Sequence, residues 1–119
     1  MQIKKPKQTE KEIQKFILEY LQSNRIGYFW RNNTGAMVAN FNGVKRFVRF
    51  GHLGSPDIIG LLEGKFIGIE CKCQGKTKLE PSQENFKAEI DRNGGYYYLA
   101  NNIDEFVNWI RALRGILRN

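Results

Sequence analysis

Asp57, Glu70 and Lys72 are the residues of this chain whose types and spacing best fit metal-assisted chemistry. Like charges placed opposite one another destabilise a hairpin, so a folded protein keeps two such carboxylates only with a shared proton, a basic neighbour or a cation. Paired carboxylates suit Mg²⁺, which often binds one or two carboxylates together with substrate phosphate. A lysine beside them can orient a water or stabilise charge on the phosphate. The pattern therefore indicates phosphodiester cleavage, and the alternative is an Asp at a strand start followed by an exposed Glu/Lys pair.

The elements that must position these residues are two strands joined by a tight turn. Two runs rich in apolar β-formers, residues 57–62 and 65–73, flank Glu63-Gly64, which predicts a hairpin with a two-residue turn. This register puts Asp57 directly opposite Glu70 on one face of the sheet, with Cβ atoms about 4.5–5.5 Å apart. The lysine two residues further along points to the same face.

Family resemblance rests on these residues and on several longer segments. Pro56-Asp57 followed by Glu70-Cys71-Lys72 resembles the PD-(D/E)xK nuclease signature. Residues 30–35 (Trp-Arg-Asn-Asn-Thr-Gly), 50–60 and 81–83 (Pro-Ser-Gln) are similar to small phage-type VRR-NUC domains, and the resemblance covers roughly residues 10–113. It implies an α/β fold with a restriction-endonuclease-like core, in which helices flank a mixed central β-sheet in the order α-β-β-β-α-β-α.

The same resemblance implies a Mg²⁺-dependent DNA endonuclease, in which Mn²⁺ can substitute. The metal ligands would be Asp57, Glu70, the backbone carbonyl of Cys71 and an acid on the first helix, while Lys72 positions the attacking water with help from Gln83. Small stand-alone domains of this kind act as homodimers, and branched DNA such as a four-way junction is the implied substrate. The alternative is a non-catalytic DNA-binding module of the same fold, and nothing in the chain separates RNA from DNA.

Two supporting residues have two interpretations each. Thr9 and Glu12 match a capping box at the start of a helix, whereas the resemblance places Glu12 at the metal, with Glu10 as its substitute. Gln83 follows Pro81 in the first turn of a second helix. It is either a helix former or a contact of the catalytic lysine, since its amide both donates and accepts hydrogen bonds.

The charge balance favours a polyanionic partner. Nineteen Lys and Arg against twelve Asp and Glu give a formal charge of +7, and a basic surround would bring phosphates to an acidic metal site. Such phosphate contacts position a nucleic acid without reading its sequence. The candidate contacts are Arg31, Asn32, Asn33, Lys45, Arg46, Arg49, Ser55, Lys76 and Lys78. For residues 31–33 a polar turn without a ligand is an equal alternative.

Helical and alternating patterns predict one domain over the 119 residues, with residues 1–8 as a flexible basic tail. The predicted helices follow Thr9 to about residue 23, begin at Pro81 and stop at Gly94-Gly95, and cover 103–117. The predicted strands cover 28–31, 57–62, 65–73 and 96–100, with a further hairpin around Asn42-Gly43. In the Tyr96-Tyr97-Tyr98 run, alternation sends neighbours to opposite faces, which favours a buried strand over a base-stacking platform.

Other functional classes are disfavoured by the composition. No apolar run approaches the ~18 residues of a membrane span, and the basic start leads into a polar stretch rather than a secretory signal, so we expect an intracellular protein. Cys71 and Cys73 with the lone His52 cannot complete a zinc site, and we expect both thiols to be reduced and packed as small hydrophobes. Ser55 and His52 lack a third orienting group, which argues against a serine nucleophile.

Overall fold

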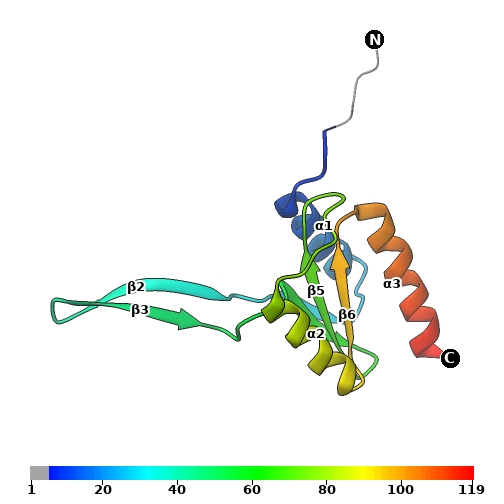
Figure 1. Ribbon diagram of the computed structural model, residues 1–119. Helices are drawn as coiled ribbons and strands as arrows, with labels where there is room; N and C mark the ends of the chain where they lie inside the picture. Colours follow the sequence, from blue (N-terminus) through cyan, green and yellow to red (C-terminus); the bar gives the residue numbers. More distant parts are fainter. Residues whose placement is uncertain (1–5) are drawn as a thin grey trace, which may run out of the picture.

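The computed structural model describes residues 6–119 and shows a mixed sheet held between helices, from which a two-stranded ribbon projects (Figure 1). The elements in chain order are α1 (Glu10–Ser23), β1 (Tyr28–Arg31), β2 (Gly35–Phe41), β3 (Val44–Phe50), β4 (Ile58–Leu62), β5 (Lys65–Cys71), α2 (Pro81–Arg92), β6 (Tyr96–Ala100) and α3 (Ile103–Arg118). The expected order α-β-β-β-α-β-α is therefore wrong for the whole chain, because β2 and β3 are inserted between β1 and β4. Without that ribbon the order is the expected one.

The main sheet has the strand order β1-β4-β5-β6, with antiparallel pairs at β1–β4 and β4–β5 and a parallel pair at β5–β6. α1 and α3 cover one face of the sheet and α2 lies on the other (Figure 1). This arrangement confirms the α/β class and the mixed central sheet. In the described chain, residues 6–119, no helix is both long and apolar enough to cross a membrane.

The core lies between the sheet and the α1/α3 layer. Alternate residues of β4 and β5, among them Ile58, Ile67 and Ile69, are fully buried against Ile13 of α1 and Phe106 of α3. Full burial of one such side chain stabilises the fold by about 1.5–3 kcal/mol. Because strand side chains alternate, the residues between these point to the α2 face, which is where the candidate site lies.

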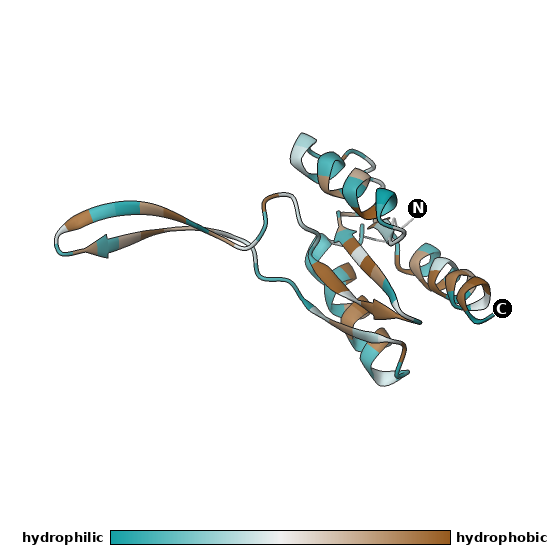
Figure 2. Cartoon of the chain, turned by 90° about the horizontal axis from the view of Figure 1, so that it is seen from below, coloured by the Kyte–Doolittle hydropathy of each residue, from teal (hydrophilic) through white to brown (hydrophobic). Residues whose placement is uncertain are grey.

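The ribbon formed by β2 and β3 stands apart from this core. Its turn is the predicted Asn42-Gly43, whose φ angles of 50° and 83° fit the left-handed conformation that such a turn requires, and the Asn40 side chain accepts a hydrogen bond from the Gly43 N–H at 2.9 Å. Every residue of both strands is exposed or half-exposed. Figure 2 shows hydrophobic and hydrophilic residues intermixed along it.

Two expectations about the chain's ends and cysteines need correction. Gln8 does not belong to a free tail, because its backbone N–H donates to the Gln74 side chain and its own side-chain oxygen accepts from the Ile103 N–H, both at 2.9 Å; residues 1–5 lie outside the described part. Strand β5 ends at Cys71, since the chain turns at Gly75 (φ 85°). Cys71 is buried as expected, but Cys73 is exposed.

Candidate active site

The β4–β5 hairpin has the predicted register. Leu62 pairs with Lys65 around a two-residue turn, and the positive φ angles of Glu63 (49°) and Gly64 (77°) are those of a primed turn. Extended by one residue, this register places Asp57 opposite Glu70, and the two carboxyl groups are in hydrogen-bonding contact. The predicted juxtaposition of the two acids is confirmed.

A backbone N–H at the end of β5 holds the Asp57 side chain against that strand. Its Oδ2 accepts a hydrogen bond from the Cys71 N–H at 2.8 Å, so the carboxylate lies at the end of β5, beside the Cys71 peptide. The backbone carbonyl of Cys71 as a metal ligand stays a prediction.

Glu70 is a buried acid, with 4% of its surface exposed. Burial raises its pKa to about 9, and the hydrogen bond and charge of Asp57 add to this rise; the Lys72 ammonium opposes it, and Glu10 adds a smaller increase. The raised pKa favours the protonated form of Glu70 at neutral pH when no cation is bound. A divalent cation would release this proton by neutralising both carboxylates.

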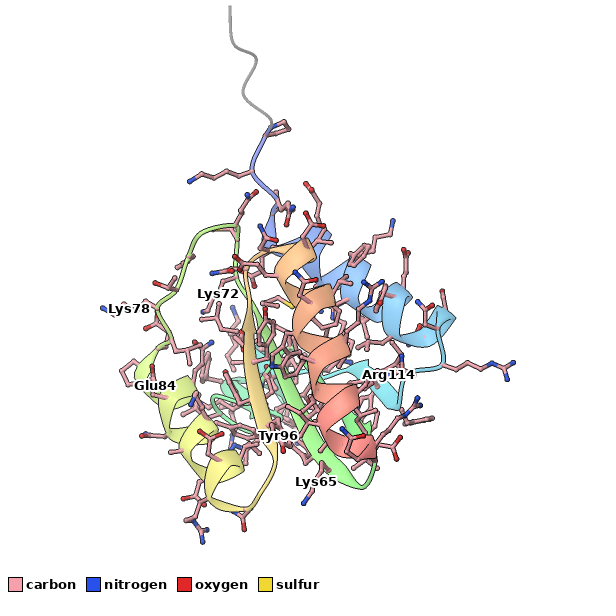
Figure 3. All side chains as sticks on the ribbon, turned by 90° about the vertical axis from the view of Figure 1, so that its right-hand side faces the viewer. Lys65, Lys72, Lys78, Glu84, Tyr96 and Arg114 are labelled. Carbon is pink, nitrogen blue, oxygen red and sulfur yellow. The ribbon has the colours of Figure 1, made fainter. Side chains whose placement is uncertain are left out.

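Lys72 lies on the same side of the sheet as the two acids. It is 8% exposed, and its backbone N–H donates to the Ala100 carbonyl at 2.9 Å, which continues the β5–β6 pairing by one residue. Figure 3 shows Lys72 on the α2 side of the sheet and Arg114 of α3 on the other. The structure thus brings Asp57, Glu70 and Lys72 together.

Asn32 holds the loop that carries Asp57. Its backbone N–H donates to the Asp57 carbonyl at 2.7 Å, and its side-chain amide donates to Ser55 Oγ at 2.7 Å and to the Pro56 carbonyl at 3.0 Å. The Ser55 hydroxyl donates to the His52 carbonyl at 2.7 Å, not to the His52 ring. In this structure the side-chain donors of Asn32 and Ser55 stabilise the loop, and their contact with phosphate stays a prediction. Sequence reasoning missed this role of Asn32.

The Gly54–Asp57 motif also packs tightly against neighbouring elements. Gly54 has φ 82°, and a Cβ there would lie 2.2 Å from the Ser82 carbonyl oxygen at the start of α2. Pro56 is buried beneath the sheet's α2 face, where a Cβ on Gly68 would come within 2.7 Å of its ring. Only glycine fits at positions 54 and 68. This close packing fixes the position of the loop that leads into Asp57.

Gln83 has the capping role in this structure. Pro81 is the first residue of α2, and the Gln83 side-chain oxygen accepts from the Glu80 N–H at 2.9 Å. This contact supports the structural interpretation of Gln83 and leaves its amide NH₂ group outside the cap. A catalytic role for that NH₂ group stays a prediction.

On the first helix, Glu10 rather than Glu12 is the acid whose charge acts on Glu70. The Glu12 side chain is exposed and its backbone N–H donates to the Thr9 hydroxyl at 3.1 Å, whereas the Glu10 charge contributes to the raised pKa of Glu70. Among residues 6–119, no three His, Cys, Asp or Glu side chains gather closely enough to hold a metal ion together. Glu12 as a metal ligand therefore stays a prediction, and the acidic donors that the structure brings together are the carboxylates of Asp57 and Glu70, which fit a hard cation such as Mg²⁺.

The expected phosphate contacts fall into separate groups. Lys76 and Lys78 are exposed in the loop between β5 and α2, and Figure 3 shows Lys78 on the side of Lys72. Asn33 is exposed at the base of the ribbon, and the ribbon itself carries Lys45, Arg46 and Arg49. These positions leave all six side chains accessible to a nucleic acid.

Arg31 lies elsewhere. By its pairing with Ile58 it belongs to the α1 face, and it lines a depression of about 340 Å³ with Lys11 and Lys15 of α1. Arg31 is thus on the opposite face of the sheet from the acidic pair, and its contact with phosphate stays a prediction. The Lys11–Lys15 spacing of one helical turn was the sequence signal for this second basic cluster, and sequence reasoning missed it.

Tyr97 is a further residue on the site's face. It pairs with Gly68, and its hydroxyl is buried with no hydrogen-bond partner among the described residues. Burial, followed by the charges of Glu70 and Asp57, raises its pKa. The neighbours Tyr96 and Tyr98 are partly buried and pack on the core, so the run is a half-buried strand, as alternation favoured over a base-stacking platform.

The site is therefore a pair of acids in contact, Asp57 and Glu70, beside the buried Lys72, at the end of a hairpin fixed by Asn32 and two glycines. Comparison of the chain with protein-family models, curated proteins and solved structures finds no match.

Proposed function

We propose that this protein is a Mg²⁺-dependent DNA endonuclease with a restriction-endonuclease-like fold of the VRR-NUC type. The observation that carries the proposal is the contact between Asp57 and Glu70, with Lys72 buried on the same face. A folded chain keeps a buried acid in contact with a half-buried one at a cost in stability, and such costs are typical of functional sites. Structural ion pairs place opposite charges together, which this pair does not.

In this proposal Asp57 and Glu70 hold the divalent cation through their oxygens. When bound, the cation polarises a phosphate and lowers the pKa of a water. Lys72 orients the attacking water or stabilises the charge that develops on the phosphate. The backbone bond from Cys71 to Asp57 keeps one carboxylate in place while substrate binds, which favours a preorganised site.

The charges around the site support a nucleic-acid substrate. The chain has a formal charge of +7, and Lys76 and Lys78 lie exposed in the loop that follows the acidic pair. We propose that these residues contact the DNA backbone, that Mn²⁺ can replace Mg²⁺, and that a homodimer cuts branched DNA such as a four-way junction. Two copies related by a two-fold axis would cut opposite strands symmetrically.

A cleavage assay tests this function. Wild type is incubated with Mg²⁺, Mn²⁺ or EDTA on a labelled four-way junction, linear duplex, flap, single-stranded DNA and single-stranded RNA. We expect cutting of the junction that EDTA abolishes, and losses of about 10²–10³-fold in Asp57→Ala and Lys72→Ala with DNA binding retained. Lys65→Ala is the matched control, because Lys65 is exposed at the other end of the same strand.

Three outcomes would contradict the proposal in different ways. A wild type that binds DNA but never cuts with any divalent ion supports the non-catalytic binding module. Normal cutting by Asp57→Ala means that the metal site lies elsewhere. Cutting of RNA in preference to every DNA would change the substrate class.

A further inference from the structure

Tyr97 has a buried hydroxyl group that the fold leaves without a hydrogen bond. Among residues 6–119, its Oη has no donor or acceptor as a partner. A buried tyrosine hydroxyl usually finds such a partner, and leaving it unpaired costs stability. Buried groups of this kind occur at functional sites or beside bound water and ions. The hydroxyl therefore suggests a group that the protein binds at this point.

The strand pairing places Tyr97 on the face of the sheet that carries the acidic pair. β6 runs parallel to β5, and Tyr97 lies beside Gly68. Gly68 precedes Glu70 by two residues, so positions 68, 70 and 97 share one face of the sheet. Two residues of a strand span about 6–7 Å, which places Tyr97 close to Glu70 along the sheet.

The ring of Tyr97 also borders the loop that carries Asp57. A Cβ on Gly68 would lie 3.6 Å from the Tyr97 ring and 2.7 Å from the ring of Pro56. The absence of a side chain at Gly68 thus lets both rings approach the same point of the sheet. Because Pro56 directly precedes Asp57, the tyrosine lies next to both parts of the acidic pair.

The charges of the acidic pair act on this hydroxyl. After burial, Glu70 and then Asp57 raise the pKa of Tyr97, and Glu84 adds a smaller increase. Glu84 belongs to α2, on the same side of the sheet as Lys72 (Figure 3). The two site acids thus act on the hydroxyl more strongly than the exposed carboxylate of the helix does. This order agrees with a hydroxyl that lies at the edge of the site.

The acidic pair leaves the hydroxyl unpaired because its carboxyl groups use other partners. Asp57 and Glu70 contact each other, and Asp57 accepts from the Cys71 N–H. A cation bound by these carboxylates would bring water to the site, since Mg²⁺ usually keeps several waters. A cation-bound water is a strong donor, because the cation lowers its pKa. A tyrosine hydroxyl can accept such a hydrogen bond.

We propose that the Tyr97 hydroxyl accepts a hydrogen bond from a water bound to the divalent cation that Asp57 and Glu70 hold. Tyr97 is then a positioning residue, which holds the water through its hydroxyl and touches neither the cation nor the phosphate. The inference rests on the cation site of the proposed function. Outer hydrogen bonds of this kind orient the groups around a metal and commonly change its affinity by 10-fold or more.

Calorimetric titration with Mn²⁺ tests the role of the hydroxyl. Tyr97→Phe keeps the ring and removes only the hydroxyl, and we expect it to bind Mn²⁺ about tenfold more weakly than wild type. Tyr98→Phe is the matched control, because it makes the same change at the next residue of β6, whose ring stacks on Trp109 at 4.2 Å between centroids. We expect wild-type affinity for Tyr98→Phe and no binding for Asp57→Ala.

Thermal unfolding separates this role from a structural one. In EDTA the Tyr97 hydroxyl has no partner to lose, so we expect Tyr97→Phe to melt at the wild-type temperature or above it. Saturating Mn²⁺ should raise the melting temperature of wild type more than that of the variant, since bound ligand stabilises the folded state according to its affinity. A variant that melts below wild type in EDTA and binds Mn²⁺ normally would make the hydroxyl structural and overturn the inference.

The inference and the proposed function fail in different ways. Wild-type Mn²⁺ affinity in Tyr97→Phe would overturn the inference and leave the acidic pair and the nuclease assignment in place. A wild type that binds Mn²⁺ without ever cutting DNA would remove the nuclease function, and the calorimetric comparison would still decide the role of Tyr97. A wild type that binds no Mn²⁺ would overturn both. If DNA is cut, Tyr97→Phe should need about tenfold more Mn²⁺ for half-maximal cutting.

Discussion

The carboxyl groups of Asp57 and Glu70 are in hydrogen-bonding contact across the β4–β5 hairpin, one just before its first strand and the other near the end of its second. Such a contact between two acids requires a proton or a cation between them. The stability of the protein and its response to divalent metal are therefore linked through this pair.

The first prediction concerns pH. Burial and Asp57 raise the pKa of Glu70 from an ordinary 4.5 to about 9, so the folded state keeps a proton that the unfolded state loses between these values. The contribution of Glu70 to stability is fully present below pH 4.5 and declines as pH rises toward 9, by at most about 1.4 kcal/mol per pH unit. In EDTA we expect Glu70→Gln to become progressively more stable than wild type over this window, as measured by chemical denaturation.

Glu19→Gln, on the exposed face of α1, is the control for the loss of a charge. Its stability difference from wild type should stay flat with pH. Saturating Mg²⁺ should remove the advantage of Glu70→Gln at pH 8, because the cation stabilises the ionised pair of wild type alone. Parallel pH profiles of wild type and Glu70→Gln in EDTA would show that Glu70 ionises freely.

The second prediction separates two neighbouring acids of α1. Glu10 adds to the rise in the pKa of Glu70, whereas the Glu12 side chain is exposed and the cap uses its backbone. We expect Glu10→Gln to weaken Mn²⁺ binding by about 3–10-fold, since a negative charge near a cation site contributes roughly 1 kcal/mol, and Glu12→Gln to leave it unchanged. Calorimetric titration measures both. The reverse order would restore Glu12 as the helix acid of the site.

The third prediction tests the close approach of Gly54 to α2. Gly54 and Gly94 have the same φ of 82°, but only at Gly54 would a Cβ meet backbone atoms, the Ser82 carbonyl oxygen at 2.2 Å. Both alanine variants incur left-handed strain of about 1–2 kcal/mol. We expect Gly54→Ala to lose at least about 2 kcal/mol more than Gly94→Ala in urea denaturation, because the loop or α2 must also move. Equal losses would mean that the loop can shift freely.

The fourth prediction divides the two roles of Gln83. Its side-chain oxygen accepts from the Glu80 N–H, and glutamate can make the same contact but lacks the NH₂ donor. We expect Gln83→Ala to lose about 1 kcal/mol of stability and Gln83→Glu to keep it. Under the proposed function, Gln83→Glu should nevertheless cut DNA about tenfold more slowly. A Gln83→Glu variant with wild-type cleavage would leave Gln83 as a helix cap alone.

Local patterns predicted most of the elements. Thr9 marked the start of α1, Pro81 the start of α2, and the Asn42-Gly43 and Glu63-Gly64 pairs the two hairpin turns. Each of these signals acts within a few residues, through a cap or a required backbone angle. The opposition of Asp57 and Glu70 followed in the same way, because a two-residue turn fixes the register of every later pair.

Contacts between distant segments could not be predicted in this way. Asn32 looked like a phosphate donor, and the structure uses it to hold Ser55 and Pro56. Gln8 looked like part of a tail, and it bonds to Gln74 and Ile103. A polar side chain has the same hydrogen-bonding capacity in either role, so the sequence does not tell which partner the fold brings to it.

The sequence by itself determined the hairpin, its register and the three residues that carry the proposed chemistry, because a strand's alternation and a two-residue turn are local rules. Only the tertiary structure decided that Glu70 is buried and has a raised pKa, that Glu10 is the nearby helix acid, and that β2 and β3 leave the sheet as a ribbon. Burial and charge proximity depend on which segments pack together, and packing is settled by the whole chain.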